Sequence, residues 1–313
     1  MRLVKKLPKL APREPDSHKG SYGTVQVIAG SRTMSGAAYL CCQGALRSGA
    51  GLVILGTPDR SARILAPQLP CCLVQPMPQT KAGALAEAAI PPALNTAKRA
   101  DVAAIGPGIS REEETKRMIV TLLQQLEIPI VLDADGLNNV ANDLYAIDGR
   151  EKRIVVTPHP REMARLMGLK SAADVQGNRV KTAMVFAERY DAVVVLKGHE
   201  TIVTDGDRIF INPTGNPGMA TGGSGDVLTG MIAALIAQGL DTFEASTLAV
   251  YAHGLAGDLA AKKFGQISMI ATDIVDALPE AFQDLVRTEF RFNAKNNGAD
   301  DRMKGDDAPP KSD

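Results

Sequence analysis

The stretch 212–228, NPTGNPGMATGGSGDVL, combines many glycines with one carboxylate directly before an apolar helical pattern. Gly222, Gly223 and Gly225 let backbone N–H groups approach a ligand closely, and the helix that begins near Gly225 points its positive end at an anion. Asp226 stands on the first turn of that helix. Because like charges repel, a carboxylate beside bound phosphate suits an acid or base that takes a proton from a substrate hydroxyl. The alternative is an ordinary glycine-rich loop in which Asp226 only starts a helix.

A lysine and a histidine follow two other apolar runs. Lys197 and Gly198 come directly after VVVL, so a cation emerges at a predicted strand end beside a glycine. That arrangement favours a phosphate contact, to which Thr201 adds a hydroxyl, and the alternative is a solvated lysine. His159 stands between two prolines, whose restricted backbone suits a side chain that must point in a fixed direction. We therefore expect His159 to contact a ligand, against the alternative of a structural histidine.

Two carboxylates bracket the end of another apolar run, in VLDADG. Asp133 and Asp135 could hold Mg²⁺ directly or through water, since Mg²⁺ commonly uses one or two carboxylates together with phosphate oxygens. The alternative is that one of them caps the helix that begins at Gly136. The metal ligands stay open at this point.

Small residues predict two places at which a ligand lies against the backbone. Gly106 and Gly108 flank a proline in IGPG, and the loop 31–36 leads into a helix whose start includes Ala37. For each, the alternative is a turn whose small residues serve packing. Residues 18–23, HKGSYG, precede the first long strand and could fold over the site.

Two polar residues lie on an apolar helical pattern near the end of the chain, in YAHGLAGDLA. We interpret His253 as a core histidine with its hydrogen bonds satisfied and Asp258 as a residue with a local structural role. The three closing helices carry Ala and Leu at helical spacing, which indicates that most of this region is packing.

Apolar, β-branched runs alternate with helical patterns, which is typical of a parallel sheet covered by helices. The predicted strands are 24–29, 52–55, 102–105, 130–133, 154–157, 192–196, 201–204 and 208–211. The last two are expected to form a β-hairpin about the turn Asp205-Gly206-Asp207. The predicted helices run from about 36 to 48, 112 to 126, 174 to 189, 225 to 237, 243 to 263 and 272 to 286.

Polar or glycine-rich loops follow nearly every predicted strand: AGSRTMSG, GPGIS, DADGLN, TPHPRE and LKGHET. In an open α/β sheet, ligands bind outside the carboxyl ends of the strands, so these loops should converge on one site. We find no internal repeat or interdomain linker and expect a single domain over residues 1–292. Residues 293–313 are charged and almost without apolar side chains, which predicts a disordered tail.

The composition narrows the function classes. With 313 residues and 45% apolar content, the chain can bury a large core. The formal net charge is zero, aromatic residues make up 4% and Trp is absent, so bulk charge and base stacking give no support for nucleic-acid binding. No run of about 18 apolar residues indicates a membrane span. We expect small molecules or copies of the same chain as partners.

The four cysteines form two vicinal pairs, Cys41-Cys42 and Cys71-Cys72. Neither a metal site nor a secreted disulfide framework has that spacing, so we expect buried thiols in a reducing compartment. The N-terminus lacks a sustained apolar segment and shows no export signal, which favours a cytoplasmic location.

The glycine loop with Asp226, placed after a hairpin and before a long helix, resembles the GxGD motif of the ribokinase-like superfamily, which supplies an anion hole and a catalytic aspartate. A closer resemblance covers roughly residues 15–285. In this order, HKGSYG, AGSRTMSGAA, ALRSGAGLV, IGPG, VLDADGLN, TPHPRE, LKG, NPTGNPGMATGGSGDVL and HGLAGDLAA resemble the ADP-dependent NAD(P)H-hydrate dehydratase family, in its stand-alone form without the epimerase domain. The resemblance implies a ribokinase-like three-layer α/β sandwich, with a mostly parallel sheet covered by helices on both faces.

The family repairs hydrated NADH and NADPH, which carry a hydroxyl on the nicotinamide ring. By resemblance, ADP donates its terminal phosphate to this hydroxyl, and phosphate then leaves to restore NAD(P)H, with AMP as the other product. Asp226 would be the general base, and would contact the hydrated dinucleotide together with Ala37, Gly108 and His159. The nucleotide would be held by Lys197, Gly198, His199, Glu200, Thr201, Gly223, Ser224 and Gly225. The resemblance also implies Mg²⁺ as cofactor, a homotetramer and a separate NAD(P)H-hydrate epimerase as functional partner.

One departure from the family concerns the loop after His159, which commonly reads HPGE and here reads HPRE. Arg161 adopts positive φ only at a cost, and its side chain could clash with the phosphates of the substrate or reach toward them. The preferences between ADP and ATP and between the two hydrated dinucleotides stay open.

Two other functions compete with the dehydratase. A ribokinase-like kinase of a vitamin precursor, of the hydroxymethylpyrimidine or hydroxyethylthiazole type, would share the mechanism but release a stable phosphoester. A nucleotide-binding module without turnover is the third, and the retained Asp226 argues against it.

Overall fold

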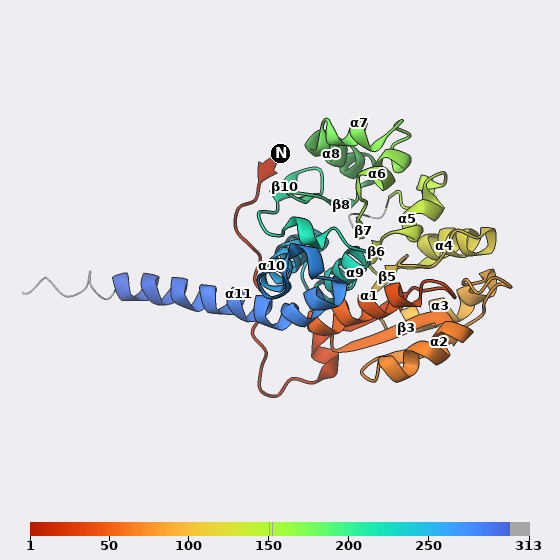
Figure 1. Cartoon of the computed structure of the whole chain (residues 1–313), viewed down its shortest axis with the longest axis horizontal. Helices are drawn as coiled ribbons and strands as arrows, with labels where there is room; N and C mark the ends of the chain where they lie inside the picture. The colour runs from red at the N-terminus through yellow and green to blue at the C-terminus, as the bar shows by residue number, and fades with distance from the viewer. Residues whose placement is uncertain (150, 152, 301–313) are drawn as a thin grey trace, which may run out of the picture.

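The computed structural model describes residues 1–149, 151 and 153–300, with side chains described as far as residue 286. Within this part of the chain the strands form one ten-stranded sheet, in the order β1-β10-β9-β8-β7-β6-β5-β2-β3-β4 (Figure 1). The strands are β1 (Arg2–Leu3), β2 (Thr24–Ile28), β3 (Leu52–Pro58), β4 (Leu73–Met77), β5 (Val102–Ile105), β6 (Ile130–Leu132), β7 (Ile154–Val156), β8 (Val193–Leu196), β9 (Ile202–Thr204) and β10 (Arg208–Ile211). Only β8–β9 and β9–β10 pair in antiparallel fashion; the other neighbours are parallel.

The eight predicted strands are present, with small differences at their ends, and the hairpin prediction is confirmed by the β9–β10 pair. Its turn is built by Asp205, whose Oδ1 accepts from the amides of Asp207 and Arg208 at 3.1 and 2.7 Å. The sequence analysis missed β1 and β4, which lie at the two edges of the sheet. β1 has only two residues, and β4 contains Pro76, which an edge strand tolerates and a central strand does not.

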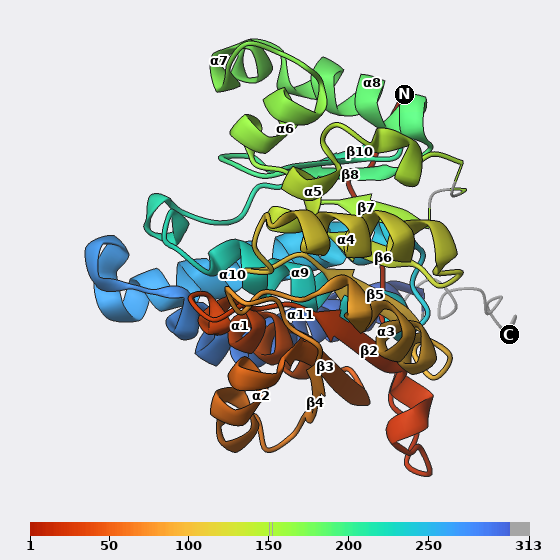
Figure 2. The same cartoon turned by 90° about the vertical axis from the view of Figure 1, so that its right-hand side faces the viewer.

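Helices cover both faces of the sheet, because alternate side chains of the buried strands face opposite ways and serve two cores. One core joins strand residues such as Val25, Val53 and Val131 to helices on the first face. Those helices are α1 (Ser35–Arg47), α2 (Asp59–Leu65), α9 (Ser224–Ala237), α10 (Thr242–Ser268) and α11 (Ala271–Asp300). The other core joins Ile28 and Ile105 to the opposite layer, which faces the viewer in Figure 2. Its helices are α3 (Ile90–Ala97), α4 (Glu113–Gln125), α5 (Asp135–Val140), α6 (Pro160–Leu166), α7 (Ala172–Gln176) and α8 (Arg179–Tyr190). The three-layer α/β prediction is confirmed.

One helix prediction was wrong in part. The pattern over 174–189 is split into α7 and α8, because Gly177 and Asn178 interrupt it. The side chain of Asn178 accepts from the amide of Lys181 at 3.3 Å and so begins a new helix. The sequence analysis also missed the short helices α2, α3 and α6, which carry fewer turns of apolar periodicity.

The cysteine prediction holds for one pair and was wrong for the other. Cys41 and Cys42 are buried on α1, while Cys71 is exposed and Cys72 is partly buried; all four thiols are free. The difference follows from position. The first pair lies on the helix that packs against α9, so closely that a Cβ added at Gly230 would come within 1.9 Å of the carbonyl of Cys41. The second lies in the turn before the edge strand β4.

The helix expected to end near Val286 continues to Asp300 as α11, which projects from the body of the molecule in Figure 1. The part of the predicted disordered tail over 293–300 is therefore helical in this structure, and 301–313 lies outside the described residues. A helix that is already nucleated extends at little cost through residues such as Ala and Lys. None of the helices in the described residues combines the length and hydropathy needed to cross a membrane.

Candidate functional site

The glycine loop ends where α9 begins, at the carboxyl edge of the sheet. Gly223 is the N-cap residue of α9, with φ of 92°, and gives no side-chain capping bond. This positive φ favours glycine, and a Cβ at this position would also lie 2.3 Å from Cδ1 of Leu40 on α1. The first amide groups of α9 are therefore left for a ligand, and the helix dipole favours an anion there.

Asp226 lies on the first turn of α9 and is partly buried. Burial, and after it the negative charge of Asp133, raise the pKa of Asp226 to about 7, while Lys197 acts in the opposite direction. A carboxylate with this pKa can accept a proton at neutral pH and hold it. The structure thus gives the predicted base an electrostatic setting that suits its role.

Lys197, at the end of β8, forms an ion pair with Asp133 at the end of β6. Lys197 Nζ lies 2.6 Å from Asp133 Oδ1, and Thr229 Oγ1 of α9 donates to Asp133 Oδ2 at 2.7 Å. Burial acts to lower the pKa of Lys197, but Asp133 and Glu162 outweigh it, so this pKa lies above its usual value. Lys197 also reaches the glycine loop, because its Nζ lies 3.1 Å from the place that a Cβ at Gly225 would take. It is therefore a paired cation beside the anion-binding turn and not a solvated lysine.

A pocket of about 750 Å³ opens beside this cluster. It brings together seven of the eight residues predicted to hold the nucleotide: Lys197, Gly198, His199, Glu200, Thr201, Ser224 and Gly225. Gly223 does not line it, and lies behind the turn against Leu40. That these residues bind a nucleotide stays a prediction.

The far wall of the pocket is a loop from 212 to 219 that is fastened to α10. Asn216 Nδ2 donates to the carbonyl of Gly257 at 2.9 Å and to Asp258 Oδ1 at 3.0 Å, and the amide of Gly215 donates to Asp258 Oδ2 at 3.0 Å. Asp258 therefore has the local structural role that the sequence indicated. A Cβ at Gly254 would lie 2.2 Å from Thr214 Oγ1, so this glycine allows the loop to approach the helix.

His253 is buried on α10, as predicted, but it also lines the pocket. Its Nε2 lies 3.4 Å from Ser224 Oγ of the glycine loop. Burial lowers the pKa of His253 to about 4, so the ring is neutral at pH 7. A core histidine thus also supports the turn that precedes Asp226.

The loop that carries Lys197 is held from behind by Arg179, at the start of α8. Its guanidinium donates to the carbonyls of Leu196, at 3.1 Å, and of His199. Gly198 adopts φ of 141°, and a Cβ there would lie 3.1 Å from Arg179 Nη2. The shape of this loop therefore depends on a glycine and on a cation from another helix.

His159 is fixed in direction, as its two flanking prolines predicted. It is the N-cap residue of α6, and its Nδ1 accepts from the amides of Arg161 and Glu162 at 3.1 and 3.3 Å. Its Nε2 lies 3.3 Å from Glu162 Oε1. Burial lowers the pKa of His159, and Lys197 lowers it further. The ring lines the pocket, and its ligand contact stays a prediction.

Arg161 stands on the first turn of α6. It is not one of the described residues that combine a side chain with positive φ. The positive φ that the family's glycine suggested is therefore not required here. The arginine therefore adds no backbone strain, and the residue is exposed.

Of the predicted dinucleotide residues, His159 lines this pocket, whereas Ala37 and Gly108 do not. A Cβ at Gly108 would lie 2.9 Å from Cβ of Ala37, so these two loops are in contact, and the amide of Gly30 donates to the carbonyl of Pro107 at 2.8 Å. A Cβ at Gly106 would lie 1.9 Å from the carbonyl of Asp133. The loops after β2, β5, β6 and β8 therefore converge, as predicted, since Asp133 also pairs with Lys197.

Asp133 and Asp135 neither cap α5 nor form a metal cage. The N-cap residue of α5 is Ala134, which has no capping side chain, and Asp135 Oδ2 accepts from the amide of Ser110 at 3.2 Å. Asp135 Oδ1 accepts from Asn138 at 3.1 Å, so both carboxylates are committed to protein donors. Among the described residues, no group of three or more His, Cys, Asp or Glu side chains could hold a metal ion. These residues therefore form no cage that could hold Mg²⁺ without further ligands such as phosphate oxygens.

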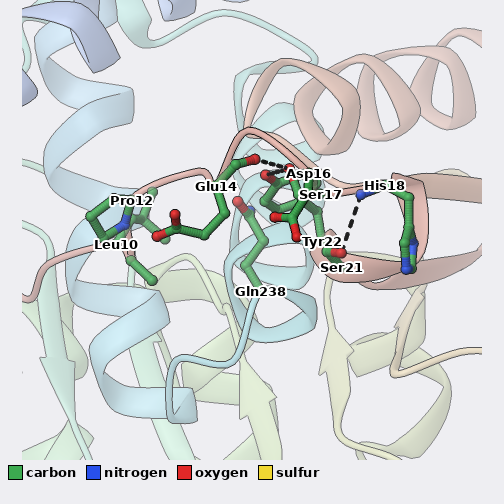
Figure 3. A pocket seen from close by; sticks show the side chains of 10 residues that line it. Leu10, Pro12, Glu14, Asp16, Ser17, His18, Ser21, Tyr22 and Gln238 are labelled. Atoms are coloured by element: carbon green, nitrogen blue, oxygen red, sulfur yellow. Dashed lines mark hydrogen bonds between the residues drawn. The ribbon is translucent and has the colours of Figure 1, made fainter.

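The expectation that residues 18–23 fold over the site is wrong for this chain. The amide of Gly51 donates to the carbonyls of Tyr22 and Gly23, so the segment lies where β2 and β3 begin. It lines a separate pocket with Gln238, the C-cap residue of α9 (Figure 3). The segment enters β2 at its amino end, which is the edge opposite the site.

The sequence analysis missed two residues that shape the site, Thr229 and Arg179. Thr229 Oγ1 also lies 3.1 Å from the carbonyl of Gly225, four residues earlier, so helical spacing from the glycine loop could have identified it. Arg179 carries no such signal, since its partners are backbone carbonyls distant in sequence.

Comparisons with known proteins show which family and fold this chain shares. The sequence model of the NAD(P)H-hydrate dehydratase family matches residues 25–280. The chain is 45% identical over 278 residues to the bifunctional NAD(P)H-hydrate repair enzyme Nnr of Moorella thermoacetica, covering 88% of this chain and 52% of that protein. The chain thus spans about half the length of the curated relatives it matches.

Two solved structures are similar along nearly their whole length. One is the ADP/ATP-dependent NAD(P)H-hydrate dehydratase of Bacillus subtilis co-crystallised with ATP and Mg²⁺, with a TM-score of 0.72 and 31% identity over 88% of this chain and 94% of that one. The other is a ribokinase-like superfamily protein of Enterococcus faecalis, with a TM-score of 0.77 and 28% identity over 90% and 95%. The fold is therefore ribokinase-like, and the chain belongs to the NAD(P)H-hydrate dehydratase family.

Proposed function

We propose that this chain catalyses the ADP-dependent dehydration of hydrated NADH and NADPH. The observation that carries the proposal is the position of Asp226, a carboxylate with a pKa of about 7 on the first turn of α9, beside amide groups left free for an anion. Family membership supplies the substrate class. Relatives with this description act on the hydrated dinucleotide, so the ring hydroxyl is the group that Asp226 would deprotonate.

In the first step, Asp226 takes the proton of the ring hydroxyl as its oxygen attacks the terminal phosphorus of ADP. The bond between that phosphorus and the bridging oxygen breaks, and AMP leaves. The amides at Gly223, Ser224 and Gly225 stabilise the charge on the phosphoryl group during the transfer. In the second step the carbon–oxygen bond breaks, phosphate leaves with the electron pair, and loss of a ring proton restores NAD(P)H.

The nucleotide would lie in the pocket between the Lys197 loop and the loop 212–219. Lys197 would meet its phosphates from one side, and the amides of α9 from the other. Mg²⁺ would enter on the nucleotide's phosphates as part of the substrate, since Asp133 and Asp135 are committed to protein donors. Ala37, Gly108 and His159 would contact the hydrated dinucleotide.

Several finer features belong to the same proposal. The relatives are bifunctional, and the stand-alone arrangement with a separate epimerase is proposed from the motifs. A homotetramer and a cytoplasmic location are proposed on the same footing. Sizing-column chromatography with light scattering tests the first of these two: a monomer at assay concentration would contradict it.

The test is an assay with hydrated NADH, Mg²⁺ and either ADP or ATP, in which the absorbance of the dihydronicotinamide is followed. The proposal predicts recovery of this absorbance with one AMP and one phosphate released per turnover with ADP. The control is Asp226→Asn protein of the same purity. No recovery with either nucleotide would contradict the proposal, and a stable phosphoester of a hydroxymethylpyrimidine or hydroxyethylthiazole would favour the kinase instead.

A further inference from the structure

Asp133 is a buried residue that connects three elements of the site: the end of β6, the loop after β8 and helix α9. It follows β6, is 1% exposed, and accepts from Lys197 Nζ of the β8 loop at 2.6 Å on one oxygen and from Thr229 Oγ1 of α9 at 2.7 Å on the other. These partners are 64 and 96 residues away in sequence. One carboxylate therefore joins two strand ends and the helix that carries the proposed base.

The bond to Thr229 fixes the first turn of α9. The same hydroxyl lies 3.1 Å from the carbonyl of Gly225, the residue directly before Asp226. A Cβ at Gly225 would lie 3.8 Å from Asp133 Oδ2 and 3.1 Å from Lys197 Nζ. The turn of the anion-binding loop therefore lies directly beside the ion pair of Asp133 and Lys197.

Two other roles for Asp133 do not fit. As a Mg²⁺ ligand it would need an oxygen that the metal can reach, whereas both oxygens accept from protein donors and the residue is 1% exposed. As a substrate contact it would need an exposed oxygen, whereas it is 1% exposed and does not line the pocket.

We propose that Asp133 is a positioning residue, which sets the place of Lys197 and of the first turn of α9 and holds the charge balance around Asp226 without touching substrate. The role of Asp226 as base rests on the proposed function, but the charge balance is a property of the protein alone. It follows that changes to Asp133 and to Lys197 act on Asp226 in opposite directions.

The direction follows from the groups that face Asp226 from each neighbouring element. Asp133 after β6, Asp135 on α5 and Glu162 on α6 raise its pKa through their negative charge, and Lys197 after β8 lowers it. Cys41 on α1 also faces it, and burial, with Asp226 as the next cause, raises the pKa of that thiol. Asp133→Asn removes a negative charge and leaves Lys197 uncompensated, so the pKa of Asp226 must fall. Lys197→Met leaves Asp133 uncompensated, so it must rise.

The experiment is a carboxyl ¹³C NMR titration of protein labelled at aspartate, with Asp226→Asn used to assign the signal. We expect the pKa of Asp226 to fall by about one unit or more in Asp133→Asn and to rise by a similar amount in Lys197→Met. Thr229→Val is the matched control: it breaks a hydrogen bond to Asp133 and changes no charge, so the pKa should stay within about 0.3 units of wild type while the melting temperature falls.

Asp133→Asn and Lys197→Met each predict a shift of the Asp226 pKa in one stated direction. If one variant does not fold, the other therefore still tests the proposal. An unchanged Asp226 pKa in either folded variant, or shifts of the same sign in both, would overturn the proposal. The titration needs no turnover, so a failure of the dehydratase assay with the NMR shifts intact would contradict the proposed function and leave this inference standing. In active protein, the acidic limb of the kcat profile should move to lower pH in Asp133→Asn, which a merely structural role would not produce.

Discussion

One pocket lies at the carboxyl ends of the strands and another at their amino ends, which are called here the carboxyl edge and the amino edge. The two pockets differ in whether they leave hydrogen-bond donors free for a ligand. At the carboxyl edge, a pocket of about 750 Å³ adjoins a buried ion pair and the amino end of α9. At the amino edge, a pocket of about 510 Å³ is lined by residues of the first 22 positions and by Gln238 at the carboxyl end of α9. The amino end of α9 therefore lines one pocket, and its carboxyl end lines the other.

At the amino ends of the strands, Gln238 and Arg13 are held by hydrogen bonds to backbone carbonyls. Gln238 Nε2 donates to the carbonyls of Ser48 and Ala234, both at 2.8 Å, and Arg13 donates to the carbonyl of Gly49 while it lies 3.8 Å over the ring of Tyr22. At the carboxyl edge, the N-cap glycine leaves the helix amides without a side-chain partner. The comparison indicates that a catalytic site needs free hydrogen-bond donors and buried charged groups. A pocket alone does not provide them.

The largest expected effect comes from the carboxyl edge. Asp226→Asn keeps the shape of the residue and removes the base, so kcat should fall at least about 100-fold, with nucleotide binding largely kept. Steady-state kinetics and calorimetric titration with ADP and Mg²⁺ measure the two quantities. Near-normal turnover in a pure sample would remove Asp226 from the mechanism.

Lys197→Ala should separate the two substrates. Because a hydrogen bond to a charged group contributes about 1.5 to 3 kcal/mol, the KM for ADP should rise about tenfold or more. The KM for the hydrated dinucleotide should change much less. The reverse pattern would show that Lys197 binds the hydrated dinucleotide. The melting temperature of the variant reports the separate cost of leaving Asp133 without its cation.

At the amino edge, Tyr22→Phe should change kinetics very little. It removes a hydroxyl that bonds to Ser17 and leaves the ring under Arg13 in place. We expect kcat and both KM values within about twofold of wild type, since substitutions away from the chemistry cost little. A large rise in either KM would break the comparison, because it would show that this segment reaches a binding site, in its own chain or in a neighbouring copy.

The smallest effect is expected from the end of α11. A chain that stops at Phe292 removes part of the helix that projects from the body in Figure 1, and the core residues described for α11 end at Ala281 and Leu285. The melting temperature should stay within a few degrees and turnover should be kept. Loss of activity, or a smaller particle on a sizing column, would show that this segment docks on another subunit.

The sequence predicted the fold and the loop cluster well, because both depend on local pattern. Alternation of apolar runs identified the strands from β2 to the β9–β10 hairpin, except the edge strand β4, and GGSGD identified the turn before α9. It did not predict that Lys197 would be paired with Asp133, since such a pair joins residues far apart in the chain. The position of residues 18–23 was missed for the same reason: nothing local says which edge of a sheet a segment will cover.

The most direct test of the account is the pH dependence of kcat for hydrated NADH with saturating ADP and Mg²⁺. The base must be ionised to act, and burial together with Asp133 raises the pKa of Asp226 to about 7. Turnover should therefore be full above this pKa and fall tenfold for each unit as the pH drops below about 7. A kcat that stays level down to about pH 5 would contradict the account, because an ordinary carboxylate or another group would then be the base.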